Sequence, residues 1–442
     1  MQAGEVREMF EKVLPRDMIE QDVAELCLQE RRRHLEPVNL VMSLVLAGGT
    51  PEAGRISEVM KEYCRNGGKR VVAGSYVRWF NDRLLAVMLR VVERMKAYVL
   101  AMPLHLPGIL AGRRDWRVVD STTIKVPREL LDVFPGTGDY AALKVHKELS
   151  LGCENVVDYH ITAAREHDGP HLVVDESRRG TGLIVDLGYV SHGLIQRAHQ
   201  HDVHLVIRLK EGWKLFADSS AMTSDILDWK ASEEVLLSLD GQPLQLPLRE
   251  HTDIDVVMGP NRDIRARLVV IETPEGWASY LTTVPRDSHS AEEIGMLYRL
   301  RWGVELQNKL AKSCCQLDQI TAKKEVSAQI LVHAAMVASM LANALAHLEH
   351  VDQGMTGSKG KRPVRPPVHA MSIWRSVRVH ASDVVRLLME PGQPDSAWSL
   401  AARNFMYDGQ DPNWKRKPSP IDQVKGRVPS GRPWRSRERR GG

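Results

Sequence analysis

Tyr298-Arg-Leu-Arg-Trp-Gly-Val-Glu-Leu-Gln-Asn-Lys-Leu-Ala-Lys312 is the stretch that decides the fold, and its pattern predicts a helix. It contains no proline, and the polar run before it supplies a helix cap. At 100° per residue, one face of this helix carries Tyr298, Arg301, Glu305 and Lys312. Core packing would require Leu or Ile on that face, and solubility alone would not require one carboxylate among two cations and a phenol. We therefore expect the face to meet an anionic ligand and Glu305 to hold a metal ion beside it.

Composition places the whole chain among ordinary globular proteins. Its 442 residues are 43% hydrophobic and 26% charged, which is enough for two or three domains with their own cores. None of the five cysteines has CxxC spacing, so we expect a reducing compartment and no disulfide framework. The most apolar run, 330–348, contains His, Ser and Asn, and is more typical of a buried helix than of a membrane span. With no signal-peptide pattern at Met1, the expectation is a cytoplasmic protein without a membrane partner.

The positive charge is concentrated in the segment 411–442. That segment has ten Lys or Arg and three Asp or Glu, a net charge of +7, so the rest of the chain carries −3 of the total of +4. Such a tail is typical of a polyanionic partner, and equally of a disordered, solvated segment that binds nothing.

Upstream of the opening stretch, β-branched runs predict a sheet. Strands are expected at 116–126, 144–151, 156–163, 183–188 and 203–209, with a helix from about 191 to 201. Asp120 lies in the middle of the first strand and Asp186 near the end of the fourth. The order β-β-β followed by β-α-β, with acids at these two places, predicts a mixed α/β sheet of the ribonuclease H-like type.

Between this sheet and the opening stretch the pattern predicts strands only. A hairpin is expected over 236–248 about Asp240-Gly241, and two further strands over 264–272 and 277–284. The fold class is therefore α/β, a ribonuclease H-like sheet with a β-strand insertion, flanked by N-terminal and C-terminal helical regions.

Three carboxylates, Asp120, Asp186 and Glu305, are the candidate catalytic residues. Each one alone has an ordinary explanation as a turn former, a cap or an ion-pair partner on a helix. Together, a sheet edge and a helix can bring them to one place, where three acids repel one another unless cations neutralise them. Oxygen ligands favour Mg²⁺ or Mn²⁺, and two such ions can activate a water or a 3′-hydroxyl against a phosphodiester. Arg301 and Lys312 would then hold phosphate oxygens.

At these residues the sequence resembles a known family. Tyr298-x2-Arg301-x3-Glu305-x6-Lys312 is similar to the YREK signature of DDE transposases of bacterial insertion sequences, in particular the insertion sequence four family. Val119-Asp120-Ser-Thr-Thr resembles the family's first acid motif. Asp186-Leu-Gly-Tyr189 resembles its second, with Leu187 where Arg is usual. Val206-Ile-Arg-Leu-Lys210 and Tyr280-Leu-Thr-Thr-Val-Pro285 resemble two further blocks.

The resemblance implies an enzyme for cut-and-paste DNA transposition. Its implied metal ligands are Asp120, Asp186 and Glu305, with two Mg²⁺ or Mn²⁺ ions. Its implied partners are double-stranded DNA at terminal inverted repeats and target DNA, bound by a homodimer. Relatives form a DNA hairpin at the cleaved ends and stack a flipped base on tryptophan. The implied DNA or phosphate contacts are Tyr298, Arg301, Lys312, Trp302, Trp277, Arg208 and Lys210.

Some of these assignments have alternatives. Trp277 is as well explained by packing within the insertion as by base stacking. For the whole protein, the alternatives are a catalytically inactive DNA-binding relic and a ribonuclease H-like nuclease without strand transfer. His199, His201 and His204 lie close in sequence, but they span a predicted helix-to-strand junction and are more typical of surface histidines than of a zinc site.

The resemblance and the patterns together divide the chain into six segments. They are a helical, DNA-end-binding domain at 1–110, the first part of the catalytic core at 111–216, the β-rich insertion at 217–289, the core helix with Glu305 at 290–320, a helical region at 321–410 and the basic tail at 411–442.

Overall fold

The computed structural model describes residues 1–28, 35–46, 56–70, 72–218, 242–273, 275–355, 366–390, 392–411 and 419–428. Its strands are β1 Trp116–Lys125, β2 Ala142–Ser150, β3 Asn155–Ala163, β4 Gly182–Val185, β5 His204–Arg208, β6 Phe216–Ala217, β7 Thr252–Met258, β8 Ile264–Thr273 and β9 Gly276–Thr282. Its α-helices are α1 Ala3–Val13, α2 Arg16–Glu25, α3 Pro37–Leu46, α4 Ile56–Arg65, α5 Ala73–Trp79, α6 Asp82–Leu100, α7 His192–Gln200, α9 Ala291–Arg299, α10 Trp302–Lys309, α11 Glu325–Met355, α12 Ala370–Val379, α13 Ala381–Met389, α14 Asp395–Asp408 and α15 Pro420–Val424.

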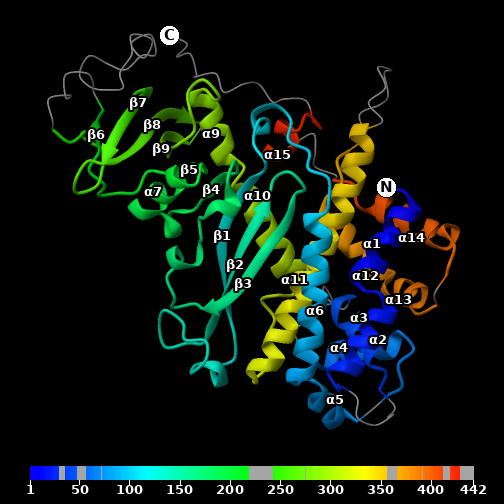
Figure 1. Ribbon diagram of the computed structural model, residues 1–442. Coiled ribbons are helices and arrows are strands. Elements are labelled where there is room, and N and C mark those ends of the chain that lie inside the picture. The colour runs from blue at the N-terminus through cyan, green and yellow to red at the C-terminus, as the bar shows by residue number, and fades with distance from the viewer. Residues whose placement is uncertain are drawn as a thin grey trace, which may run out of the picture.

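The strands form one mixed sheet in the order β3-β2-β1-β4-β5-β9-β8-β7-β6 (Figure 1). The meander β1–β3 is antiparallel, and β4 and β5 run parallel to β1. The five predicted strands of this part are confirmed, as is the helix before β5. This strand order with these directions is ribonuclease H-like, as expected.

The insertion extends that sheet. Its last strand, β9, returns antiparallel beside β5, and β8, β7 and β6 follow outward. The strands predicted at 264–272 and 277–284 are therefore confirmed. Of the hairpin predicted over 236–248, the turn Asp240-Gly241 and the first arm lie outside the described residues, and residues 242–248 contain no strand.

Helices from the two ends of the chain share one core. The long helices α6 and α11 pack side by side against β3 (Figure 1). The buried residues of α1–α4, α6 and α11–α14 belong to the same hydrophobic cluster as one face of β2 and β3. Among the described residues one helix, Glu325–Asp352, is long and apolar enough to cross a membrane, and 94% of its most apolar window is buried inside the protein. The prediction of a buried helix there is confirmed, while the division into domains stays a prediction.

The single helix predicted over 298–312 is wrong. Helix α9 ends at Arg299, and α10 begins at Trp302. Between them, i→i+3 hydrogen bonds from the amides of Leu300 and Arg301 tighten the chain into a turn. After Lys309 the helix widens into the π-helical segment Leu310–Cys314. The four signature residues therefore lie on four segments, namely α9, the turn, α10 and the π-helical segment. A regular 100° wheel does not describe where they point.

Part of the basic tail is folded, so the prediction of disorder does not hold for residues 419–428. Ser419 caps α15, and Lys425 and Arg427 are buried, where both donate to the carboxylate of Glu154. The two cations and this carboxylate attach the end of the described chain to the loop between β2 and β3.

Three histidines of α11 are buried in the neutral form. Burial lowers the pKa of His333 and of His347 to about 4, and that of His350 to about 3. In the unfolded chain each titrates near 6.5. Below pH 6.5 the unfolded state therefore binds protons that the folded state cannot bind until pH 4 to 3, and stability falls as pH drops through this window.

His350 allows a direct test of this pH dependence, because its two ring nitrogens have no hydrogen-bond partner among the described residues. We expect His350→Leu to flatten the fall in the free energy of unfolding between pH 6.5 and 4, by at most about 1.4 kcal/mol per pH unit. Urea unfolding at four pH values measures this slope. The same substitution at the exposed His167 is the control and should leave the slope unchanged. Parallel curves for wild type and His350→Leu would contradict the assignment.

Candidate active site

The register of β1 and β4 places the first two acids side by side. These strands are parallel, with Val119 opposite Val185, so the next residues, Asp120 and Asp186, are neighbours across the sheet. Side chains alternate between the two faces of a strand. Both acids therefore point to the face where Val118 packs beneath α9 and α10.

Helix α10 brings the third acid to the same face. The guanidinium of Arg301 donates to Glu305 Oε1 at 2.8 Å, and its other nitrogen lies 3.8 Å from Asp186 Oδ1. Arg301 is thus the cation that connects the helix acid to the strand acid. The predicted convergence of Asp120, Asp186 and Glu305 is seen in the geometry.

The surroundings of Asp120 disfavour its charged form. Burial raises its pKa to about 6, and the neighbouring Asp186 adds to the rise, while Arg301 and Asn308 oppose it. Asp120 and Asp186 are like charges placed close together, and Arg301 is the guanidinium that lies among the acids. Added positive charge would therefore stabilise this site.

Asn308 and Lys147 complete the site, and the sequence analysis missed both. Asn308 Nδ2 donates to Asp120 Oδ2 at 3.2 Å, and Lys147 Nζ donates to Asn308 Oδ1 at 2.9 Å. Burial lowers the pKa of Lys147 to about 7. Below that pH it is an ammonium that can only donate, which fixes the amide with its N–H group toward Asp120. Asn308 lies three residues after Glu305, which was a usable signal. Lys147 is found only from the pairing of Asp120 with Lys147 across β1 and β2.

Cations and phenols lie on both sides of the acids. The Tyr298 ring packs against Tyr280, with 5.1 Å between centroids, and lies 5.9 Å from the Arg301 guanidinium. Arg208 pairs with Tyr280 at the end of β5 and is exposed. On the other side, Lys312 Nζ donates to the carbonyl of Thr123, three residues beyond Asp120 on β1.

The other three residues predicted to contact DNA, Trp302, Lys210 and Trp277, lie in different places. Trp302 is 52% exposed and lines a cavity of about 310 Å³ bounded by α10, α11 and α15. Lys210 is exposed just beyond β5. Trp277 does not lie near the acids. It precedes Tyr280 by three residues in β9, so strand alternation places the two side chains on opposite faces of the sheet. There it packs on the other core of the sheet, edge-on to His251.

The chemistry of the three acids fits a divalent cation. All the donors are carboxylate oxygens, which suit Mg²⁺ or Mn²⁺ rather than softer metals. Asp120, Asp186 and Glu305 would hold the ion. Burial and, to a lesser extent, the charge of Asp186 raise the pKa of Asp120, and a bound cation would oppose both effects.

The family described as Transposase DDE domain matches residues 112–341, just over half of the chain. The chain belongs to this family of DDE transposase domains. The match spans all three acids, from β1 through α10 and into α11. The geometry of the acids therefore lies inside the matched domain.

Sequence relatives are also transposases. A putative transposase InsL for insertion sequence element IS186A of Escherichia coli (strain K12) is 39% identical over 79 residues, 17% of this chain and 21% of the relative. The transposase for insertion sequence element IS231E of Bacillus thuringiensis subsp. finitimus is 23% identical over 249 residues, 47% of this chain and 52% of the relative. The chain thus spans between a fifth and a half of the length of these relatives. A chain of a piggyBac transposase synaptic complex with hairpin DNA has a TM-score of 0.46 at 10% identity, covering 95% of this chain and 89% of that one.

The connection from Lys147 through Asn308 to Asp120 is testable by stability. We expect Asn308→Ala to lower the free energy of unfolding by about 1–3 kcal/mol, because it leaves the buried Lys147 ammonium without its acceptor. In a Lys147→Met background, Asn308→Ala should cost at least about 1 kcal/mol less, since no buried charge is then abandoned. Urea unfolding at pH 6 of the four proteins measures this coupling. Additive effects would show that the two residues act independently.

Proposed function

We propose that this chain is a transposase that cuts DNA at the ends of an insertion sequence and joins those ends to target DNA. One observation carries the proposal: three acids of a matched transposase domain converge on one face of a ribonuclease H-like sheet, beside a row of cations. Membership of the family supports DNA as the partner and divalent metal ions as the cofactor. Two Mg²⁺ or Mn²⁺ ions, terminal inverted repeats and a homodimer on DNA are the finer parts of the proposal.

Each residue has a defined task in the proposed reaction. Bound ions would activate the attacking oxygen and stabilise the leaving oxygen of the phosphodiester. Arg301 offers its guanidinium to nonbridging phosphate oxygens when DNA enters, and exchanges its contact with Glu305 for them. Asn308 donates to Oδ2 of Asp120 and so would hold this carboxylate in place for the ion. Tyr298, Arg208 and Lys312 extend the phosphate-binding surface on both sides.

The proposed chemistry consists of two displacements at phosphorus. Water attacks the phosphodiester at the end of the element and breaks the P–O bond, which frees a 3′-hydroxyl. That hydroxyl then attacks a phosphodiester of the target, which forms one P–O bond as another breaks. A catalytically inactive relic would not carry out the first displacement. A plain nuclease would carry out the first displacement but not the second.

Glu305→Gln tests the first displacement. We expect cleavage of DNA that carries the gene's flanking ends to fall by about a thousand-fold or more, because several kcal/mol of charge stabilisation are lost. Binding of the same DNA should persist. Glu292→Gln, at an exposed position of α9, is the control and should cleave like wild type. Undiminished cleavage by Glu305→Gln would refute the site, and no cleavage by wild type would favour the relic. Supplying a pre-cleaved end with a target plasmid separates a transposase, which joins them, from a nuclease, which does not.

The basic segment beyond Val428 gives a second prediction. Residues 429–442 contain five arginines and one glutamate, while the buried Lys425 and Arg427 lie before them. Removing 429–442 should therefore preserve the fold yet lower the slope of log binding constant against log salt, by up to about four if each lost net charge neutralised a phosphate. Fluorescence anisotropy on a terminal DNA duplex from 50 to 300 mM salt measures the slope. An unchanged slope would mean that the segment contacts no phosphate.

A further inference from the structure

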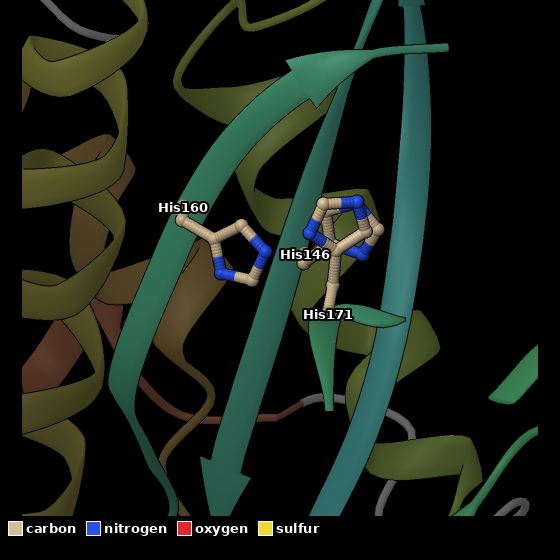
Figure 2. A group of neighbouring side chains, drawn as sticks. All are labelled: His146, His160 and His171. Atoms are coloured by element: carbon tan, nitrogen blue, oxygen red, sulfur yellow. The ribbon is translucent and has the colours of Figure 1, made fainter. Parts of the chain in front are cut away.

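A cluster of three histidines lies on the sheet face opposite the acids. His146 on β2 is paired directly with His160 on β3, and both point to that face. His171 ends the short 3-10 helix Gly169–His171, and its ring lies beside that of His146 (Figure 2). The ring centroids are 4.6 Å apart for His146 and His160, 4.5 Å for His146 and His171, and 5.1 Å for His160 and His171. One ring nitrogen from each lies within 4.8 Å of the others.

We propose that His146, His160 and His171 form a binding site for one divalent ion of the zinc class, distinct from the oxygen-ligand site of the acids. Imidazole nitrogens suit Zn²⁺, Co²⁺, Ni²⁺ and Cu²⁺, whereas the three carboxylates suit Mg²⁺ and Mn²⁺. The sheet therefore carries two cation sites of different chemistry, back to back. Because Ser121 is paired with His146 and follows Asp120 on β1, the two sites are separated by the thickness of one strand.

Two of the three rings, those of His146 and His160, are in the neutral state that a metal requires. Burial lowers the pKa of His146 to about 3 and also lowers that of His160, and in both cases His171 adds to the effect. Neutral imidazoles offer lone pairs at neutral pH without first losing a proton. Among the described residues, the ring of His160 has no hydrogen-bond partner, so its nitrogens are available.

Groups around the cluster can orient its ligands. His146 Nδ1 lies 2.8 Å from the hydroxyl of Tyr189, and its Nε2 lies 3.0 Å from that of Thr162. A metal-bound histidine usually bonds such a partner through its other nitrogen. Glu166 Oε2 lies 3.3 Å from His171 Nε2 and is within reach as a further oxygen ligand. The ammonium of Lys144, which acts on His146, is paired with Asp168 at 2.9 Å.

The required movement is small. Zinc–nitrogen distances of about 2.0–2.1 Å and tetrahedral angles place ligand nitrogens about 3.3 Å apart. The nitrogens therefore have to approach by no more than about 1.5 Å from their 4.8 Å limit. His160 and His171 reach solvent, so their rings can rotate toward the fixed ring of His146, and an ion can enter from the same side.

The site is connected to the acids through Tyr189. This tyrosine ends the 3-10 turn Leu187–Tyr189, for which Asp186 is the N-cap residue. An ion that takes His146 Nε2 from Thr162 leaves Nδ1 bonded to the Tyr189 hydroxyl. It then also fixes this phenol, and with it the turn that follows Asp186. Because the three histidines come together only in the folded chain, a bound ion should also stabilise the folded state by mass action.

Cobalt is the probe that distinguishes the two sites. The full chain is stripped with chelator, returned to excess Mg²⁺ so that the acids are supplied, and titrated with Co²⁺ alone. We expect one equivalent of Co²⁺ per chain, visible ligand-field bands typical of nitrogen ligands, and a rise in Tm. The double variant His160→Asn with His171→Asn should bind at least about a hundred-fold more weakly and lose the bands.

Two controls complete the experiment. His199→Asn with His201→Asn removes two histidines that do not belong to the cluster. The ring of His199 contacts the carbonyl of Arg265 instead. This variant should bind Co²⁺ like wild type. Glu305→Gln should also keep the bands, so the result does not depend on the proposed transposase activity. If the double variant fails to fold, the two single variants replace it, each with weakened binding expected. Bands that survive in these variants, or no Co²⁺ bound by wild type, would overturn the proposal.

Discussion

The parallel pairing of β1 with β4 is the constraint on which the rest of the site depends. Because Val119 faces Val185, the chain must place Asp120 beside Asp186, and two carboxylates then share one partly buried edge. The repulsion between these carboxylates has to be offset. Among the described residues, Arg301 is the only cation seen in contact with both Asp186 and Glu305. The turn that separates α9 from α10 puts that arginine where the acids meet.

Both faces of the sheet follow from the same pairing. On one face the acids meet α10, and Lys147 reaches Asp120 through Asn308. On the other, the residues that alternate with them, Ser121 on β1 and His146 on β2, begin the histidine cluster. Helices from both ends of the chain then build one core against β2 and β3, with α11 at its centre, and so fix the meander that carries Lys147 and His146.

Much of the sheet was predictable because strands and acids leave local signals. The β-branched runs gave β1 to β5, and an acid in the middle of Trp116–Lys125 is costly enough to be noticed. The break at Leu300–Arg301 and the π-helical segment were not predictable, because Gly303 is the one poor helix former in the stretch and no proline stands there to end a helix. The positions of Lys147 and of the pair His146 and His160 depend on strand register, which a single sequence does not reveal. His171 reaches that pair from a 3-10 helix that follows β3 in the chain. His199 and His201 are closer in sequence than His146 and His160. Yet among the described residues it is the rings of His146 and His160 that stack and offer nitrogens to a common site.

The central claim is that Asp120, Asp186 and Glu305 form one cation site. The most direct measurement is Mn²⁺ binding to the full chain, followed by electron paramagnetic resonance, in wild type and in Asp120→Asn, Asp186→Asn and Glu305→Gln. If the three acids act as one site, each substitution alone weakens Mn²⁺ binding by at least about ten-fold, since each removes a carboxylate ligand. Unchanged affinity in any one of the three variants would contradict the claim.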